Sequence, residues 1–175
     1  MIRSRLQDSI RDIPDFPKPG ILFKDITPIL KDQELCSEII DAFAEQLTGI
    51  EIDVIAGIES RGFLFGLMLA NRLGVPFVPI RKQGKLPFKT IQQPCELEYG
   101  SAILEMHQDA ILPGQKVLIH DDLLATGGTV NAASRLIKQL DGVIAGYAFV
   151  ISLDFLNGKD ALKQQSSNIV SLISF

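Results

Sequence analysis

The sequence predicts a three-layer αβα domain built around a mostly parallel sheet. Several segments, such as residues 52–58 and 143–153, are nearly continuous apolar runs rich in β-branched residues. Runs of this kind are typical of strands that are buried on both faces, and segments with helical periodicity separate them along the chain. The length of 175 residues suits one such domain, large enough to bury its own core.

The N-terminal part is expected to lead into this sheet. Residues 3–13 have the pattern of a short amphipathic helix that a proline would stop. Residues 14–20 are rich in proline and favour an extended segment ahead of residues 21–23. A helix is predicted over residues 32–47, because apolar residues recur at helical spacing between an N-capping aspartate and a terminating glycine.

Strands and helices then alternate along the chain. The strand at residues 52–58 precedes a helix at residues 60–73, which a glycine ends. The next strand, at residues 77–80, contains a proline that suggests an interruption or a sheet edge. Residues 83–95 lack periodicity and are expected to form a polar, basic loop.

The C-terminal half completes the sheet. A hairpin is predicted from residues 96–99 and 102–106, with its turn at Gly100 and Ser101. The buried strand at residues 116–120 is expected to end abruptly at two aspartates. The remaining predicted elements are a helix at residues 129–140 and strands at residues 143–153 and 169–173.

Composition and charge exclude several classes of protein. Seventeen basic and twenty-one acidic residues give a net charge of −4, the opposite of the balance expected for general nucleic-acid binding. The longest apolar runs fall far short of the ~20 residues of a membrane span, and no signal-peptide block is present. Cys36 and Cys95 are too few for a zinc or disulfide framework, and Cys36 is expected to be a small buried side chain. We expect a cytoplasmic protein that binds neither nucleic acid nor membrane.

Ligands of such sheets bind at the carboxyl ends of the strands, where the loops after Ile58, Ile80 and His120 should meet. The last of these loops lies in the most informative stretch, residues 117–129. Free amides at a helix start, with glycines that allow close approach, form an anion cradle, here made of Ala125, Thr126, Gly127, Gly128 and Thr129.

The acid pair Asp121 and Asp122 precedes this cradle directly. Two carboxylates beside an anion site make sense if the ligand also presents hydroxyls or a divalent cation, so a sugar phosphate fits better than bare phosphate. A Walker nucleotide loop is excluded, because no Gly-Lys-Ser/Thr follows the glycines.

Residues 117–129 resemble the phosphoribosyl pyrophosphate (PRPP) signature of the type I phosphoribosyltransferases. Four more segments resemble the adenine phosphoribosyltransferases in the order that family has them, namely residues 19–28, 57–63, 81–87 and 97–100. The resemblance implies that adenine and PRPP give AMP and pyrophosphate with Mg²⁺, in a homodimer. It also implies a single domain over residues 1–175, with a base-binding segment at residues 1–30 and a flexible lid loop and hairpin, the hood, at residues 83–106.

The resemblance assigns the residues that bind PRPP. Residues 125–129 would hold the 5′-phosphate, and Asp121 and Asp122 the ribose hydroxyls, so that Mg²⁺ is held mainly through PRPP without a direct protein ligand. A pyrophosphate loop would consist of Glu59, Ser60 and Arg61, with a cis peptide between the first two. The guanidinium fork of Arg61 suits phosphate oxygens.

A basic cluster follows the strand at residues 77–80, and its members are Arg81, Lys82, Lys85 and Lys89. A solubilising charge run would look the same, but the place after a strand favours pyrophosphate binding, chiefly by the first three. Residues 83–95 would close over the site as a lid and exclude water.

The resemblance also assigns the base and the proton transfer. Phe23 would stack on adenine, while the carbonyl of Leu22 and the amide of Lys24 read its edge; the family usually has arginine in place of Lys24. Glu98 would act as acid/base, with Glu96 left open as a competitor because both share one strand face.

Tyr99 would belong to the lid. His120, where the family commonly has an apolar residue, is expected to be packed and hydrogen-bonded.

Two alternatives stay open. One is an enzyme for another base, which the segment around Phe23 would decide. The other is a PRPP-sensing transcriptional regulator without turnover, against which the acidic charge and the short segment before the fold both argue.

Overall fold

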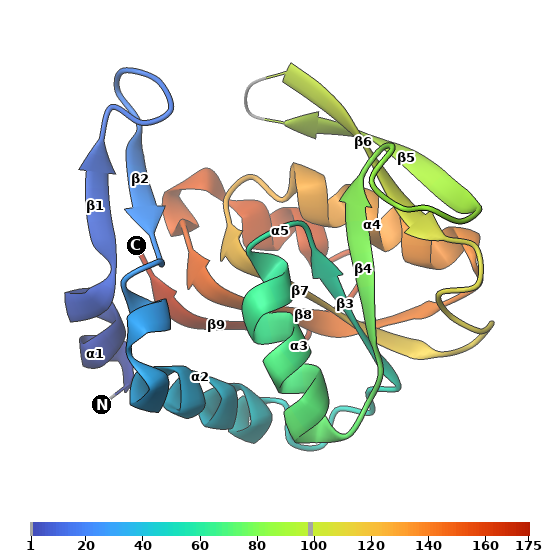
Figure 1. Cartoon of the computed structure of the whole chain (residues 1–175), viewed down its shortest axis with the longest axis horizontal. Coiled ribbons are helices and arrows are strands. Elements are labelled where there is room, and N and C mark those ends of the chain that lie inside the picture. The colour runs from blue at the N-terminus through green and yellow to red at the C-terminus, as the bar shows by residue number, and fades with distance from the viewer. Residues whose placement is uncertain (1, 98–99) are drawn as a thin grey trace.

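The computed structural model describes residues 2–97 and 100–175, and within them a seven-stranded sheet is covered by helices on both faces (Figure 1). The strand order is β5-β6-β4-β3-β7-β8-β9. The strands are β3 (Val54–Ile58), β4 (Phe77–Lys82), β5 (Thr90–Leu97), β6 (Gly100–His107), β7 (Lys116–Leu124), β8 (Val143–Ser152) and β9 (Ile169–Ser174). In the order β4-β3-β7-β8-β9 the neighbouring strands are parallel, whereas β6 pairs antiparallel with both β4 and β5. The sheet is thus mostly parallel, which confirms the predicted fold class.

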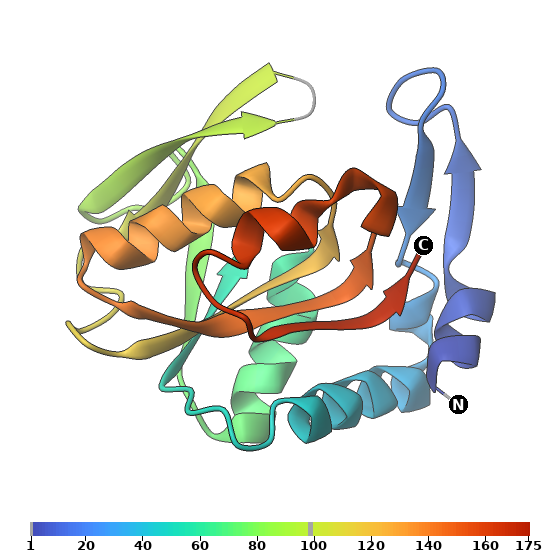
Figure 2. The same cartoon turned by 180° about the vertical axis from the view of Figure 1, so that it is seen from behind.

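Helices enclose two apolar layers, one on each side of the sheet. On one side lie α2 (Gln33–Gln46) and α3 (Gly62–Leu73), and on the other α4 (Gly128–Gln139) and the short α5 (Gly158–Leu162), as Figure 2 shows from behind. The remaining helical elements are α1 (Ile2–Ser9) and the single turns η1 (Ile29–Lys31) and η2 (Asp154–Leu156). No helix in the described residues is long and apolar enough to cross a membrane.

The helices α2, α3 and α4 form where local signals predicted them, whereas the short α5 was not predicted. Asp32 caps α2 by accepting a hydrogen bond from the Leu35 amide at 2.9 Å, and Leu35, Ile39 and Phe43 are completely buried on one face. Gly74 ends α3 in the left-handed conformation with φ of 70°. Cap residues and helical periodicity act within a few residues of each other, so the sequence alone predicts these helices.

A two-stranded ribbon replaces part of the predicted N-terminal helix. The helix α1 ends at Ser9, and β1 (Arg11–Pro14) pairs antiparallel with β2 (Leu22–Asp25). The prediction of a helix through residue 13 was therefore wrong. Pairing with the next strand in the chain supplies the backbone hydrogen bonds that a continued helix would otherwise have made, and the periodicity of residues 3–13 does not reveal this pairing.

The hairpin is longer than predicted. β5 begins at Thr90, so the prediction of an irregular loop through residue 95 was wrong, and residues 83–89 alone form that loop. Gly100 and Ser101 pair with Leu97 and Glu96, so the turn is not at these two residues as predicted. β5 is an edge strand that contains Pro94, and such a strand is held by pairing with β6 more than by an apolar pattern.

Two further strands differ from their predictions. β7 does not end before the acid pair but continues to Leu124, because residues 121–124 pair with β8. β4 lies inside the sheet, yet around Pro79 it pairs only with β3, since its pairing with β6 begins at Arg81. The proline thus occupies a local edge, where its missing N–H is tolerated.

Candidate functional site

The carboxyl ends of β3, β4 and β7 meet at one edge of the sheet as expected, although β4 and β7 run past Ile80 and His120. Glu59, after β3, donates its amide to the Ile80 carbonyl and accepts the Lys82 amide at 2.8 Å through its carboxylate. Arg61 Nε, after β3, lies 3.1 Å from Asp122 Oδ2 on β7. In Figure 1 the β1–β2 ribbon and the β5–β6 hairpin rise on either side of this edge of the sheet.

A cavity of about 270 Å³ opens at the start of α4. It is lined by the predicted cradle together with Glu96, Asp121, Leu123, Leu124 and Val130. The first amides of a helix have no acceptor within it, so this cavity is suited to an anion. The cavity therefore unites the predicted cradle with one member of the acid pair.

Both glycines of the cradle are required by the backbone. Gly127 has φ of +87°, which side-chain-bearing residues rarely adopt. A Cβ on Gly128 would lie 2.6 Å from the Glu96 carbonyl oxygen, so only glycine lets β5 approach this closely. Beside it, the Cys95 thiol lies 3.8 Å from the Thr129 hydroxyl. The hairpin thus rests on the start of α4.

The acid pair is held in a low-polarity environment. Asp122 is buried, with 2% of its surface exposed, and its amide donates to Asp121 Oδ1 at 2.8 Å. Burial and the charge of Asp122 raise the pKa of Asp121 well above its usual range, and burial also raises the pKa of Asp122, against which Arg61 works. The pair therefore holds a proton more readily than two exposed aspartates, which suits contact with hydroxyl groups.

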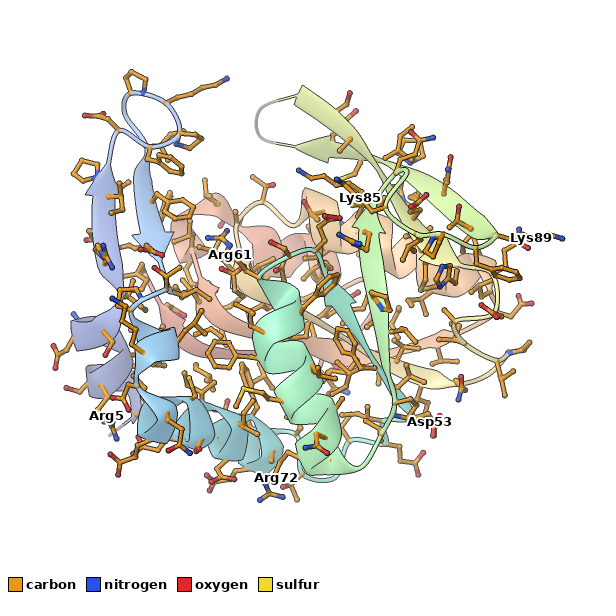
Figure 3. All side chains as sticks on the ribbon, viewed as in Figure 1. Arg5, Asp53, Arg61, Arg72, Lys85 and Lys89 are labelled. Carbon is orange, nitrogen blue, oxygen red and sulfur yellow. The ribbon has the colours of Figure 1, made fainter. Side chains whose placement is uncertain are left out.

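Arg61 connects the acid pair to the base-binding segment. Its Cζ lies 4.9 Å from the centre of the Phe23 ring, a cation–π distance, while its Nε lies 3.1 Å from Asp122 Oδ2. This ion pair lacks hydrogen-bond geometry, so within the described residues Asp122 Oδ2 accepts no hydrogen bond. Figure 3 shows Arg61 at the start of α3, on the side of the sheet where the ribbon stands.

The peptide between Glu59 and Ser60 is cis, which confirms the expectation.

The base-binding segment is β2. The Phe23 ring meets the Phe16 ring edge-on at 5.1 Å, and Leu22 is half exposed. The Lys24 side chain is buried away from these groups: its Nζ lies 2.7 Å from Asp12 Oδ1 and 4.0 Å from the centre of the Phe175 ring. Only the backbone of Lys24 is therefore available beside Phe23. The presence of lysine where the family usually has arginine does not change these backbone groups.

The basic cluster divides into bound and free cations. Arg81 Nε lies 3.4 Å from Glu59 Oε1, and one Arg81 nitrogen donates to the Lys85 carbonyl at 3.2 Å. The Lys82 and Lys85 side chains are exposed and, among the described residues, make no ion pair. Lys89 lies at the far end of the hairpin from Arg61, as Figure 3 shows. The structure thus brings three of the four cations toward the pyrophosphate loop.

The candidate acid/base is only partly described. Glu98 and Tyr99 lie outside the described residues. Glu96, the competitor left open from the sequence, lines the cavity. The choice between the two carboxylates therefore stays a prediction.

His120 is packed as expected but not hydrogen-bonded as expected. It is completely buried, and its ring meets the Phe43 ring edge-on at 5.5 Å. Among the described residues neither ring nitrogen has a hydrogen-bond partner. Burial lowers its pKa to about 4, and the nearby Ala148 backbone opposes this shift without reaching hydrogen-bond geometry. His120 is thus a neutral core residue behind the acid pair.

Sequence reasoning missed one carboxylate near the site, Glu105, and the contacts of another, Glu59. Glu59 was assigned to the pyrophosphate loop, but its carboxylate holds the Lys82 amide and faces Arg81. Glu105 was not singled out, although it is 2% exposed on β6 and accepts amides of the basic loop. A lone acid in the apolar run at residues 102–106 was the available signal. Within the described residues no group of three or more His, Cys, Asp or Glu side chains is arranged to hold a metal ion.

Comparison with known proteins agrees with this geometry. Residues 26–171 match the phosphoribosyl transferase domain family. The full chain is 51% identical over 175 residues to the adenine phosphoribosyltransferase of Cytophaga hutchinsonii and covers 97% of it. It resembles the crystal structure of adenine phosphoribosyltransferase from Thermoanaerobacter pseudethanolicus with a TM-score of 0.94 at 50% identity, covering 100% of both chains.

A second similar structure carries ligands. The adenine phosphoribosyltransferase of Saccharomyces cerevisiae, complexed with D-2,5-dideoxy-2,5-imino-altritol 1,6-bisphosphate and adenine, has a TM-score of 0.89 at 42% identity, with 98% of each chain covered. The similarity to these proteins spans every segment that contributes to the site.

Proposed function

The chain belongs to the adenine phosphoribosyltransferases of the phosphoribosyl transferase domain family, and from this membership we propose how its residues carry out the reaction. The enzyme transfers the phosphoribosyl group of PRPP to adenine, a step of purine salvage that gives AMP and pyrophosphate. The C1′–O bond to pyrophosphate breaks and a C1′–N9 bond to adenine forms. The protein has to hold a multiply charged leaving group, align the base and exclude water.

The ribose 5-phosphate half of PRPP binds at the start of α4. The cavity of about 270 Å³ offers the free amides of Ala125, Thr126, Gly127, Gly128 and Thr129 to the 5′-phosphate. Asp121 and Asp122 take the ribose hydroxyls, because their carboxyl oxygens can accept hydroxyl protons and the buried Asp122 Oδ2 accepts no hydrogen bond within the described residues. This division explains how two acids coexist with an anion site.

The pyrophosphate half binds between the loops after β3 and β4. Arg61 exchanges its contact with Asp122 for the pyrophosphate oxygens, while the Glu59–Ser60 segment supplies backbone groups. Lys82 and Lys85 add cations whose side chains are free to move toward the ligand. Arg81 contributes indirectly, since Glu59 and the Lys85 carbonyl already engage it.

Mg²⁺ fits this donor set. The ion usually keeps several waters and is held by one or two carboxylates together with substrate phosphates. The buried Asp122 Oδ2, which accepts no hydrogen bond within the described residues, suits a hydroxyl or a hydrated cation. When bound with PRPP, Mg²⁺ would offset the charge of the leaving pyrophosphate, and Asp121 and Asp122 would hold it through the ribose.

The base binds against β2. Phe23 stacks on adenine once Arg61 leaves its ring, and the Leu22 carbonyl and Lys24 amide read the edge that carries the amino group. Adenine loses a ring proton as N9 attacks C1′. Glu98 accepts this proton from N7, and Glu96 is the competing candidate for the same role. Tyr99 and residues 83–106 cover the reacting atoms as the hood, inside a single domain over residues 1–175.

One observation carries this proposal: Arg61 contacts both Phe23 and Asp122, and so joins the proposed base and ribose sites through the pyrophosphate loop. The test is AMP formation from PRPP and Mg²⁺ with adenine, hypoxanthine or guanine. A site built on such hydrogen bonds rejects the wrong base by ~10⁴-fold. Comparable turnover of hypoxanthine would overturn the base assignment, and no turnover of any base would favour a PRPP sensor.

The homodimer and the cytoplasmic location remain predictions. Sedimentation at assay concentration tests the first, and fractionation of the source cells tests the second.

A further inference from the structure

Glu105 is a charged residue in a place where charges are rarely found. It lies on β6 between Leu104 and Met106, whose side chains belong to the apolar layer beneath α4, so the Glu105 side chain points to the other face of the strand, where the basic loop covers it. Only 2% of the Glu105 surface is exposed. An ionised carboxylate in such a place is costly unless hydrogen bonds satisfy it, so its partners indicate why it is there.

Those partners are backbone amides of the basic loop. Glu105 Oε1 accepts the Lys85 amide at 3.0 Å and the Leu86 amide at 2.9 Å, and the Thr90 hydroxyl lies 3.4 Å from Oε2. Burial raises the pKa of this carboxyl, but the hydrogen bonds from the Leu86 and Lys85 amides, together with the nearby Gly84 amide, outweigh burial and lower it. Glu105 therefore stays ionised and holds the turn at residues 84–86.

The peptide groups around Lys85 are held on both sides. The amide of Lys85 donates to Glu105, and its carbonyl accepts from Arg81 at 3.2 Å. The neighbouring Gly84 has φ of +84°, which defines the turn. The Lys85 ammonium, by contrast, is exposed and makes no hydrogen bond or ion pair within the described residues. The backbone is thus fixed while the cation is free.

The arrangement separates the acids from the cations. Glu105 binds amides, and Glu59 binds the Lys82 amide and faces Arg81, so neither carboxylate neutralises the ammonium of Lys82 or Lys85. A carboxylate paired with a lysine ammonium would compete with an incoming anion for that ammonium. A carboxylate that accepts the backbone amide of the lysine leaves the ammonium available to the anion. Figure 3 shows Lys85 beside the hairpin, on the same side of the sheet as Arg61.

From this geometry we infer that Glu105 is a positioning residue for pyrophosphate: by fixing the Lys85 backbone it places the Lys85 ammonium at the pyrophosphate end of the PRPP site. The inference rests on the proposed function, because it presupposes that PRPP binds between the loops after β3 and β4. It adds a residue that touches no substrate and acts through Lys85.

The test is steady-state kinetics of Glu105→Ala, Glu105→Gln and Lys85→Ala. Glu105→Ala leaves two amides without acceptors, and we expect KM for PRPP and the inhibition constant of pyrophosphate to rise about tenfold while KM for adenine changes less than twofold. Glu105→Gln keeps an acceptor oxygen and should stay within threefold of the unmodified enzyme. The variant that combines Glu105→Ala with Lys85→Ala should be no worse than the more impaired single variant, because Glu105 acts only through the Lys85 ammonium.

Ile111→Ala is the matched control, since it removes packing from the apolar layer beneath α4 without touching the basic loop or the hood. It should lower the unfolding temperature and leave KM for PRPP unchanged. Additive losses in the double variant, or an equal KM change in Ile111→Ala, would overturn the inference. If Glu105→Ala does not fold, hydrogen exchange of the unmodified protein decides: slow exchange of the Lys85 and Leu86 amides supports the inference, and exchange at the rate of an open loop overturns it. Inactivity of the unmodified enzyme would instead contradict the proposed function.

Discussion

Replacing His120 with leucine is expected to remove a large part of the acid sensitivity of the fold. His120 is completely buried, its ring nitrogens lack partners within the described residues, and burial lowers its pKa to about 4 from an ordinary value of 6.5. The unfolded chain therefore binds a proton at this residue between pH 6.5 and 4 that the folded chain does not. Stability rises with pH wherever the unfolded state binds more protons, so His120 destabilises the fold progressively as the pH falls through this window.

The magnitude follows from the pKa difference. Each pKa unit is worth about 1.4 kcal/mol, so acidification from pH 7.5 to 5.0 should cost the His120 protein about 2 kcal/mol through this residue alone. Below pH 4 His120 is protonated in both the folded and the unfolded chain, so its contribution to the loss of stability levels off. The carboxyl groups titrate alike in the unmodified protein and in the His120→Leu variant. The difference between the two proteins in the stability lost on acidification therefore isolates His120.

Urea unfolding followed by circular dichroism at pH 7.5 and 5.0 measures this difference. The His120→Leu protein should lose about 2 kcal/mol less free energy of unfolding on acidification than the unmodified protein. At pH 7.5 the variant should be at least as stable, because two polar atoms without partners leave the core. Equal losses in both proteins would refute the account of His120 as a neutral buried base.

The remaining predictions concern the site. Glu98→Gln should lower the rate of AMP formation ~10²–10⁴-fold with little effect on PRPP binding, and the reverse result, with Glu96→Gln inactive and Glu98→Gln normal, would transfer the role to Glu96. Arg61→Ala should weaken PRPP, measured by titration calorimetry, about tenfold or more while changing adenine affinity much less, because it removes a charged fork that phosphate oxygens can use; equal losses for both ligands would contradict this. Lys24→Met should keep the backbone reading of adenine but lose a half-buried ion pair, so thermal unfolding should show about 1 kcal/mol lower stability at an unchanged preference for adenine over hypoxanthine. A changed base preference would mean that the Lys24 side chain takes part in recognition.

Much of the fold and of the site follows from signals that are short in sequence. Asp32 and the apolar residues after it specify α2 within four turns, and the buried strand β3 shows itself as an apolar run. The cradle of residues 125–129 and the acid pair are contiguous, so one stretch of chain contains most of the PRPP site. Chemistry that is contiguous can be predicted, because the spacing along the chain sets the spacing in space.

Strand pairing could not be predicted in the same way, even where the partner strands are neighbours in the chain. Residues 11–14 became a strand because β2 lies beside them, and β5 began at Thr90 because β6 supplies its partners. The sequence by itself determined the fold class, the anion cradle and the acids beside it. Only the tertiary structure decided that Arg61 reaches both Phe23 and Asp122, and that Glu105 holds the Lys85 backbone. These contacts join residues far apart in the chain, and their energy arises only when the fold brings the groups within hydrogen-bond or ion-pair distance and removes them from water.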